Sequence, residues 1–358
     1  MAKHMFPGAN TPDGFFSYFD QILPYCAAKR TIYLKGTSGS GKSTLMKKIG
    51  AAFETKGNKV EYLHCSNDAD SLDGICVRDL GVSIIDGTAP HVNDPVIPLA
   101  IDEIFNLADF IEAEPAITHK AELLALNLAK KQLIDKAYHY FHAAYDIHLN
   151  NTYINEQALE QAKLNTEIVK WLAIFNDLPP KKAAGQDRKL FASAVTPDGP
   201  VNFIDRIIGG CTVNVLYAEH GMGADRMLSE IRRAANLRGL DTESFCCPLH
   251  PSQPEHLLIP DLNLSFTTAN QYHTRSLKSA KEIYFSDFLD HKQLSDHKDE
   301  IEYNNGMFNE LLQKTIAMLQ AAKIHHDQIE NIYLQGVNFK QLDEACAKML
   351  SRLESITS

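Results

Sequence analysis

The chain has 358 residues, of which 44% are hydrophobic and 22% are charged, and its formal net charge is −10. This composition is typical of a globular protein of two domains and offers no basic surface, so we expect no nucleic-acid partner. No apolar stretch approaches the ~20 residues of a membrane span and the N-terminus shows no signal-peptide pattern, so we expect a cytoplasmic protein without membrane contact.

A phosphate-binding loop is predicted near the N-terminus. Residues 36–43 read GTSGSGKS, which fits the pattern G-x-x-x-x-G-K-[ST]. The β-branched and aromatic run at 31–34 precedes the loop as a buried strand would, and apolar residues at helical spacing follow it over 43–56. Strand, loop and helix therefore stand in the order that the motif requires.

The residue types of this loop suit a nucleoside triphosphate bound with Mg²⁺. Glycines let backbone N–H groups surround the phosphates, and the following helix points its positive end at them. We expect Lys42 to contact the β- and γ-phosphates and the Ser43 hydroxyl to bind Mg²⁺. No Asn-Lys-x-Asp guanine signature is present, so ATP is the expected nucleotide. The predicted nucleotide-binding residues are Gly36, Thr37, Ser38, Gly39, Ser40, Gly41, Lys42, Ser43 and Thr44.

Two acidic positions compete for the second protein ligand of Mg²⁺. Asp86 follows the apolar run at 82–85, whereas Asp102 and Glu103 follow a second apolar run at 98–101. Apolar residues around the Asp102–Glu103 pair share one helix face, so we interpret this pair as the acidic start of an amphipathic helix. Asp86 is therefore the favoured metal ligand and, with Lys42, a predicted catalytic residue.

The segment after Asp86 turns sharply away from the carboxyl end of a predicted strand, where open α/β sheets bind ligands. His91, Thr88 and Asp94 are candidates to meet a substrate or an attacking water. For His91, our third predicted catalytic residue, a structural hydrogen bond is an equally weighted alternative. Residues 64–73 are interpreted as a polar connector at the same edge. Arginines available to assist catalysis are Arg78, Arg188 and Arg206.

The chain also repeats itself. Residues 34–91 align without gaps on residues 216–273 at an offset of 182, and the T-P-D-G sequence at 11–14 recurs at 196–199. Identities follow the order of strand, loop, helix and strand, which indicates a tandem duplication of one α/β unit.

A segment rich in proline, glycine and lysine at 178–185 has linker composition and marks the expected boundary. We therefore predict a P-loop nucleotide-binding domain at 1–180 and a degenerate copy at 181–358. Apolar residues at helical spacing predict a helical hairpin packed on the first sheet, with corresponding helices at the end of the second copy. The hairpin covers 120–145 and 156–175, and its counterparts cover 310–323 and 340–353.

The second copy lacks the residues that would carry the chemistry. At the positions of the phosphate lysine, the Mg²⁺ serine and the strand aspartate it has Ala224, Asp225 and Thr268. A carboxylate at Asp225 would repel a triphosphate at close range. The adjacent cysteines Cys246 and Cys247 are interpreted as small buried hydrophobic residues rather than metal or redox groups.

The loop, residues 83–91 (SIIDGTAPH), residues 71–74 (SLDG) and the two T-P-D-G openings together resemble a family of bacterial ATPases with two P-loop-type halves, within the P-loop NTPase superfamily. The resemblance implies an α/β fold of two three-layer units with mainly parallel sheets, each with added helices. We expect a Mg²⁺-dependent ATPase or a kinase-like phosphotransferase whose acceptor, a small molecule or a protein, is unknown. The alternative is a nucleotide-dependent switch whose second half contacts a partner.

Overall fold

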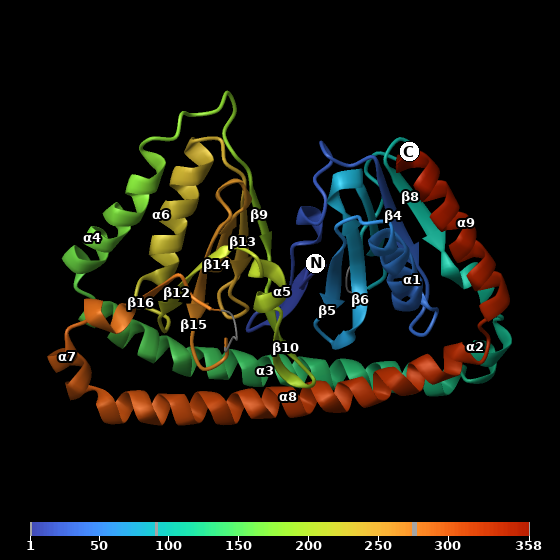
Figure 1. Cartoon of the computed structure of the whole chain (residues 1–358). Helices are drawn as coiled ribbons and strands as arrows, with labels where there is room; N and C mark the ends of the chain where they lie inside the picture. Colours follow the sequence, from blue (N-terminus) through green and yellow to red (C-terminus); the bar gives the residue numbers. More distant parts are fainter. Residues whose placement is uncertain (1, 90–91, 274–277, 358) are drawn as a thin grey trace.

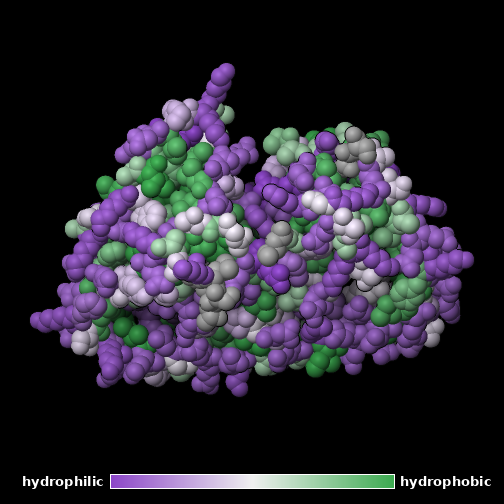
Figure 2. All heavy atoms as spheres, viewed as in Figure 1, coloured by the Kyte–Doolittle hydropathy of each residue, from purple (hydrophilic) through white to green (hydrophobic). Residues whose placement is uncertain are grey.

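Two α/β units stand side by side on a pair of long antiparallel helices (Figure 1). The computed structural model describes residues 2–89, 92–273 and 278–357. The long helices are α3 (Lys120–Ala158) and α8 (Lys298–Leu334). Among the described helices, none combines the length and the apolar character needed to cross a membrane. Hydrophilic residues dominate the lower edge of the molecule, where these two helices run (Figure 2).

The first unit is built on a six-stranded, mainly parallel sheet. Its strands are β1 (Lys3–Met5), β4 (Arg30–Lys35), β5 (Glu61–Cys65), β6 (Asp68–Val77), β7 (Val82–Asp86) and β8 (Asp102–Asn106). They lie in the order β1-β5-β6-β7-β4-β8, and only β6 runs antiparallel to its neighbours. The prediction of a polar connector at 64–73 is therefore wrong, because most of these residues belong to β5 and β6, which pair as a bulged hairpin.

The second unit repeats this topology strand for strand. Its strands are β9 (Asp187–Leu190), β12 (Thr212–Tyr217), β13 (Thr242–Cys246), β14 (Pro254–Ile259), β15 (Leu264–Ala269) and β16 (Lys281–Tyr284). Their order, β9-β13-β14-β15-β12-β16, matches that of the first sheet, again with one antiparallel strand, β14. The predicted α/β class and tandem duplication are thus confirmed.

Smaller elements close the ends of both units. The T-P-D-G sequences form the turns of two hairpins, β2 (Gly8–Thr11) with β3 (Gly14–Ser17), and β10 (Ser193–Thr196) with β11 (Gly199–Asn202). The short α-helices are α2 (Glu114–Thr118), α5 (Ile204–Ile208) and α7 (His291–Asp296). The 3-10 segments are η1 (Phe19–Gln21), η2 (Arg78–Leu80), η3 (Leu107–Phe110), η4 (Ala173–Phe175), η5 (Pro260–Leu262) and η6 (Phe285–Phe288).

Each sheet has helices on its outer face and shares its inner face with the other sheet. On the first sheet the outer helices are α1 (Lys42–Thr55) and α9 (Phe339–Thr357), and on the second they are α6 (Ala224–Leu237) and α4 (Gln161–Leu172). Between the sheets lies one apolar core with contributions from both units, including Met5, Leu63, Val213 and Phe245. The two units therefore bury their inner faces against each other.

The outer helices are exchanged between the units. Helix α4 follows the first sheet in sequence, yet its Leu164 and Ile168 lie in the core of the second unit beside α6. Helix α9 follows the second sheet, yet its Leu342 and Leu353 lie in the core of the first unit beside α1. The segment at 178–185 connects α4 to β9 within the second unit, where Lys181 N donates to Arg238 O, and the chain passes between the units along α3 and α8 (Figure 1).

The predicted helical hairpin on the first sheet is wrong for the same reason. Residues 120–158 form a single helix, α3, which packs against α8 rather than folding back with α4. An apolar face at helical spacing shows that a helix packs against a partner, but it does not identify that partner.

The structure also extends the sequence repeat beyond residue 91. From β8 onward the two copies align at an offset of 178, which places α3 on α8 and α4 on α9.

Candidate nucleotide site and its degenerate copy

The predicted phosphate loop connects the end of β4 to the start of α1. Gly39 and Gly41 have φ values of 73° and 86°, the left-handed region in which glycine is the least strained residue. Gly41 is the N-cap of α1, so the helix begins at Lys42, beside the phosphate loop as the motif predicts. Gly36 to Ser40 form the turn itself, and Thr44 is exposed on the first turn of α1.

Polar groups of the loop turn inward. In the described part of the chain, Thr37 Oγ1 and Ser40 Oγ are buried and have no hydrogen-bond partner. The Lys42 ammonium donates to the carbonyl of Thr37 at 3.0 Å. Buried hydroxyls normally pair with protein, water or a ligand. A loop with left-handed glycines, inward hydroxyls and a lysine at a helix N-terminus fits phosphate oxygens in its donor groups and its shape.

Asp86 ends β7, next to the β4 strand that carries the loop, and it pairs in register with Leu34. Its Oδ2 lies 3.6 Å from Lys42 Nζ, and its Oδ1 accepts hydrogen bonds from Thr88 N at 2.8 Å and Thr88 Oγ1 at 2.6 Å. Thr88 thus orients Asp86 instead of facing a substrate. The Ser43 hydroxyl accepts from Leu72 N at 3.1 Å, which leaves its second lone pair for another partner.

Asp102 has a structural role at the opposite end of the sheet, and its prediction as a helix start is wrong. It is the first residue of strand β8 and pairs with Thr31, where β4 begins. Its side chain is buried, and Oδ2 accepts from Val96 N at 2.7 Å and Ile97 N at 2.8 Å. Parallel pairing with β4 overrides the weak helical pattern of this short segment. The equivalent region of the second copy is strand β16 as well.

A second buried carboxyl, Asp73 on β6, was missed by the sequence analysis. It is 4% exposed, and burial together with the neighbouring Asp86 raises its pKa to about 8. The Cys65 thiol is hydrogen-bonded to it. The sequence repeat could have identified this residue. The alignment at offset 182 places an acid, Glu255, at the position of Asp73, and a cysteine, Cys247, at the position of Cys65.

Helices from the end of the chain cover the loop. A Cβ atom added to Gly39 would lie 2.8 Å from Glu330 Cγ of α8, and one added to Gly41 would lie 2.8 Å from Leu342 Cδ2 of α9. Burial raises the pKa of Glu330, as do the acidic neighbours Asp327 and Asp68, whereas Lys323 and Lys42 oppose the shift. Nothing in the local sequence links Glu330 to a loop almost 300 residues earlier.

The other predicted residues fall elsewhere. His91 lies outside the described residues. Asp94 pairs with Lys35 at 3.0 Å, and the same ammonium donates to the Gly87 carbonyl at 2.7 Å, so Lys35 holds the segment after β7. Two of the candidate arginines, Arg78 and Arg188, are engaged by buried glutamates between the two units and not by the loop.

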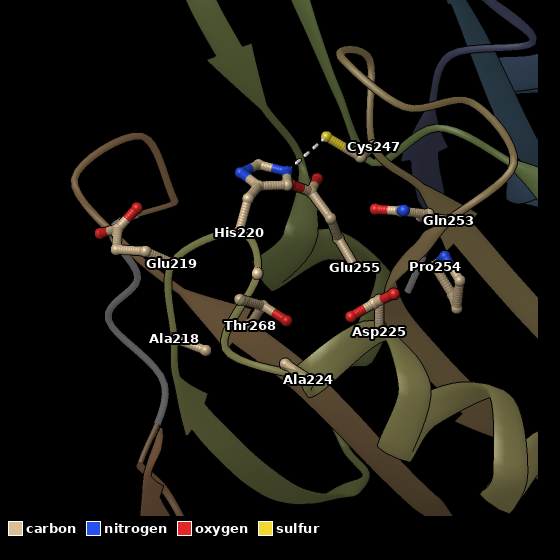
Figure 3. Close-up of a pocket in the computed structure, with 11 residues that line it drawn as sticks. Ala218, Glu219, His220, Ala224, Asp225, Cys247, Gln253, Pro254, Glu255 and Thr268 are labelled. Carbon is tan, nitrogen blue, oxygen red and sulfur yellow. Dashed lines mark hydrogen bonds and ion pairs between the residues drawn. The ribbon is translucent and has the colours of Figure 1, made fainter. Parts of the chain in front are cut away.

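The second copy keeps the turn of the loop but surrounds it with acids (Figure 3). Gly221 and Gly223 are left-handed, with φ of 83° and 90°. A pocket of about 370 Å³ opens there, lined among others by Glu219, Asp225 and Glu255. Burial, and then Glu255, raises the pKa of Glu219 to about 7. These carboxyl groups, without the lysine, make the pocket unsuited to a triphosphate.

The structure therefore brings Lys42, Ser43 and Asp86 to one end of the first sheet, adds Asp73 and Glu330, and places Asp102 elsewhere. No protein-family model, curated protein or solved structure matches the chain.

Proposed function

We propose that the first unit binds one Mg²⁺–nucleoside triphosphate, ATP by default, and transfers its terminal phosphoryl group to water or to a bound acceptor. The observation that carries this proposal is the loop between β4 and α1, with left-handed Gly39 and Gly41 and with Lys42 beside the carboxylate of Asp86. Loops of this kind present backbone N–H groups and a helix dipole to phosphate. Catalysis of phosphoryl transfer is mainly positioning and charge neutralisation, for which these residues are suited.

Each side chain has a defined part in the proposal. Lys42, which now contacts Thr37 O and Asp86, neutralises phosphate oxygens. Asp86, oriented by Thr88, and the Ser43 hydroxyl, anchored on Leu72 N, hold the cation. Mg²⁺, when bound, supplies additional positive charge against the transferred phosphoryl group.

The decisive test is the number of sites. Calorimetric titration of the full chain with a non-hydrolysable ATP analogue and Mg²⁺ should give a stoichiometry near one, because the second loop has Ala224 and Asp225 in place of the lysine and serine. Two equivalent sites per chain would contradict the assignment of the second copy as degenerate. Failure to bind any nucleoside triphosphate would refute the proposal itself.

The two acidic candidates separate by mutation. Asp86→Asn should lower Mg²⁺-dependent turnover by about 10²-fold, the usual loss when one charge-stabilising group is removed from such a site. Asp102→Asn should leave turnover within a few-fold but cost about 1–3 kcal/mol of folding free energy, because a buried acceptor of several hydrogen bonds is altered. Turnover against Mg²⁺ concentration and thermal melting of both variants measure this. Greater loss of turnover in the Asp102 variant would reverse the assignment.

A nucleotide-dependent switch is the second candidate, and the contacts of the loop with α8 and α9 favour it. Any change in the loop on nucleotide binding meets Glu330 and Leu342 directly. Because α8 packs along α3, which also reaches the second unit, such a change can be passed between the units. Hydrogen exchange of α8 and α9 with and without nucleotide distinguishes the candidates: a switch requires a change in protection there, whereas an enzyme requires turnover.

Glu330→Gln should raise the affinity for Mg²⁺–nucleotide. Removing one negative charge near the phosphates relieves a repulsion that at about 4 Å is ~1 kcal/mol in a water-like dielectric and about 4 kcal/mol at an effective dielectric of about 20, so the affinity should rise by roughly fivefold or more. Glu310→Gln, which removes an exposed charge from the same helix, is the matched control and should change nothing. If Glu330→Gln instead weakens binding, the carboxylate contacts the cation or its water.

A further inference from the structure

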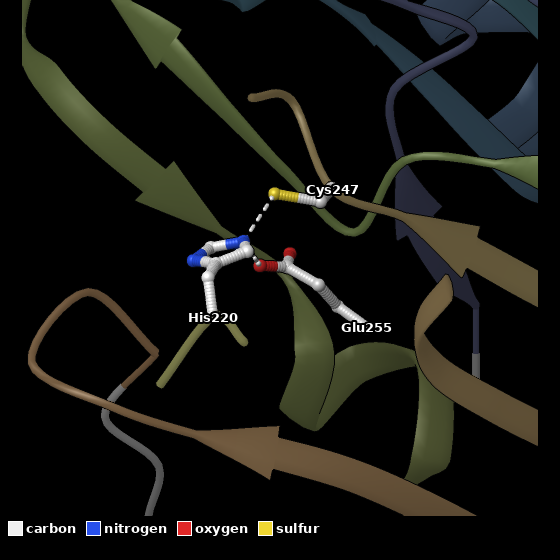
Figure 4. Close-up of side chains that lie close together, drawn as sticks. All are labelled: His220, Cys247 and Glu255. Carbon is white, nitrogen blue, oxygen red and sulfur yellow. Dashed lines mark hydrogen bonds and ion pairs between the residues drawn. The ribbon is translucent and has the colours of Figure 1, made fainter. Parts of the chain in front are cut away.

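The degenerate copy gathers a different set of functional groups. His220 from its loop, Cys247 after β13 and Glu255 on β14 point toward one another (Figure 4). His220 Nε2 lies 3.2 Å from Cys247 Sγ and 3.9 Å from Glu255 Oε1. One nitrogen, one sulfur and one carboxylate oxygen thus lie within 4.8 Å of one another. These three residues come from separate elements, and only the fold brings them together.

The cluster is buried and supported from behind. Cys247 and Glu255 are 2% and 6% exposed. His220 Nδ1 lies 3.0 Å from His148 Nε2 of α3, which fixes the ring and leaves Nε2 directed at the cluster. Glu255 Oε2 lies 3.5 Å from His273 Nε2, which in turn contacts Ser193 Oγ at 3.0 Å. Outer partners of this type orient the ligands of metal sites in proteins.

The distances fit a tetrahedral metal ion. Zn²⁺ binds sulfur at about 2.3 Å and nitrogen or carboxylate oxygen at about 2.0–2.2 Å, so neighbouring ligand atoms in a tetrahedron lie about 3.3–3.6 Å apart. The two measured separations, 3.2 and 3.9 Å, bracket this value. Imidazole, thiolate and carboxylate together suit Zn²⁺ better than Mg²⁺ or Ca²⁺, which prefer oxygen.

We propose that the second unit binds one Zn²⁺ through His220 Nε2, Cys247 Sγ and Glu255 Oε1. The thiol of Cys247 releases its proton to solvent as the zinc–sulfur bond forms. The first copy has Ser38 where the second has His220, so it retains the cysteine and the acid but lacks the imidazole. Loss of the phosphate lysine and gain of a histidine therefore change the chemistry of the same loop from anion to cation binding.

The three proposed ligands leave room for a fourth, because they also line open pockets. Two open pockets adjoin the cluster, the one of about 370 Å³ and a second of about 480 Å³. All three ligands line both cavities. The second cavity has mainly apolar walls, including Phe141, Val195, Leu249, Phe308 and Leu312. Three protein ligands beside a cavity are typical of catalytic zinc sites, so this site would admit a water or a small apolar molecule with a metal-binding group.

Metal analysis of the full chain tests the proposal. Protein stripped with a chelator, reloaded with Zn²⁺ and desalted should retain one zinc per chain, and the Co²⁺ form should show a thiolate-to-cobalt charge-transfer band. Cys247→Ser and His220→Asn should abolish both. Cys246→Ser, which alters the adjacent buried thiol, is the matched control and should keep both. His148→Ala should weaken zinc binding about 10–100-fold, as loss of an outer partner does elsewhere.

Several results would overturn the proposal. Absence of stoichiometric zinc from the reloaded wild-type protein would by itself reject the proposal, and this result does not depend on the folding of any variant. A cobalt form without the thiolate band, or equal metal loss in Cys246→Ser and Cys247→Ser, would also reject it and leave His220 and Cys247 as a simple hydrogen-bonded pair. The site is independent of the nucleotide site, so Lys42→Ala should bind zinc like the wild type.

Discussion

Lys42→Ala is expected to abolish nucleotide-dependent turnover while the fold stays intact. The Lys42 ammonium is the positively charged side chain of the loop, and it contacts Thr37 O and Asp86 rather than the core. Removing one preorganised electrostatic contact of this type typically costs about 3 kcal/mol or more in the transition state, a loss of at least about 10²-fold. Initial rates with ATP and Mg²⁺, together with circular dichroism, measure both parts.

A lysine on the same helix provides the control for this experiment. Lys47 is exposed on α1 and donates to the Asp70 carbonyl, so Lys47→Ala should keep turnover near that of the wild type. If Lys42→Ala retains activity within a few-fold, the loop is not the catalytic site. If both variants lose activity equally, the effect comes from the general charge of α1.

Arg188→Met is expected to destabilise the whole molecule. The guanidinium of Arg188 is 6% exposed and makes hydrogen bonds of 2.9 and 2.7 Å to both carboxylate oxygens of Glu61, across the contact between the two units. It also donates to the carbonyls of Gln21 and Ile22. Removing one partner of a buried pair leaves an uncompensated charge, which costs about 3–5 kcal/mol. Urea unfolding of the two proteins gives the difference.

Two further variants define the mechanism of that loss. Arg233→Ala removes an arginine from an exposed i,i+3 pair with Glu230 and should change stability by less than about 0.5 kcal/mol. Arg188→Met combined with Glu61→Leu should recover much of the stability, because no buried charge then remains unpaired. An Arg188→Met protein that unfolds like the wild type would show that the pair contributes nothing.

Acid pH should weaken the contact between the two units at Glu243. Burial alone would raise the pKa of Glu243, but Lys3, Arg188 and Arg78 lower it on balance. A carboxyl whose pKa is lower in the folded state stabilises the fold above its ordinary pKa. This contribution is lost as the pH falls through the lowered value, where Glu243 becomes protonated.

Local sequence was sufficient to predict what depends on neighbours in the chain. The loop at 36–43, its strand and its helix are adjacent in sequence, and glycine spacing reports the turn directly. The strand at 82–86 was equally clear, because Val82, Ile84 and Ile85 are apolar and β-branched, and the structure buries the whole strand. Comparison of the two copies then identified which residues of the second loop had diverged.

Residues that act through tertiary contacts were not predictable in this way. The short edge strand β8 has alternating burial over only five residues, which a helical pattern can imitate. Glu330 reaches the loop from α8, and Cys247 joins His220 and Glu255 only because β13, β14 and the loop after β12 converge. The prediction that Cys247 is buried is correct. The spacing of residues 220, 247 and 255 in the sequence, however, matches no familiar metal-binding motif.

The exchange of α4 and α9 bears on the ancestry of the molecule. Each sheet is covered by the final helix of the other copy, and the equivalent residues Leu164 and Leu342 contact equivalent glycines, Gly223 and Gly41. Such reciprocity is what a domain-swapped homodimer gives when its two protomers become joined in one polypeptide. A single copy would have to pair with a second to cover its own sheet. In a fused pair of this kind, one of two identical loops can diverge without loss of the other.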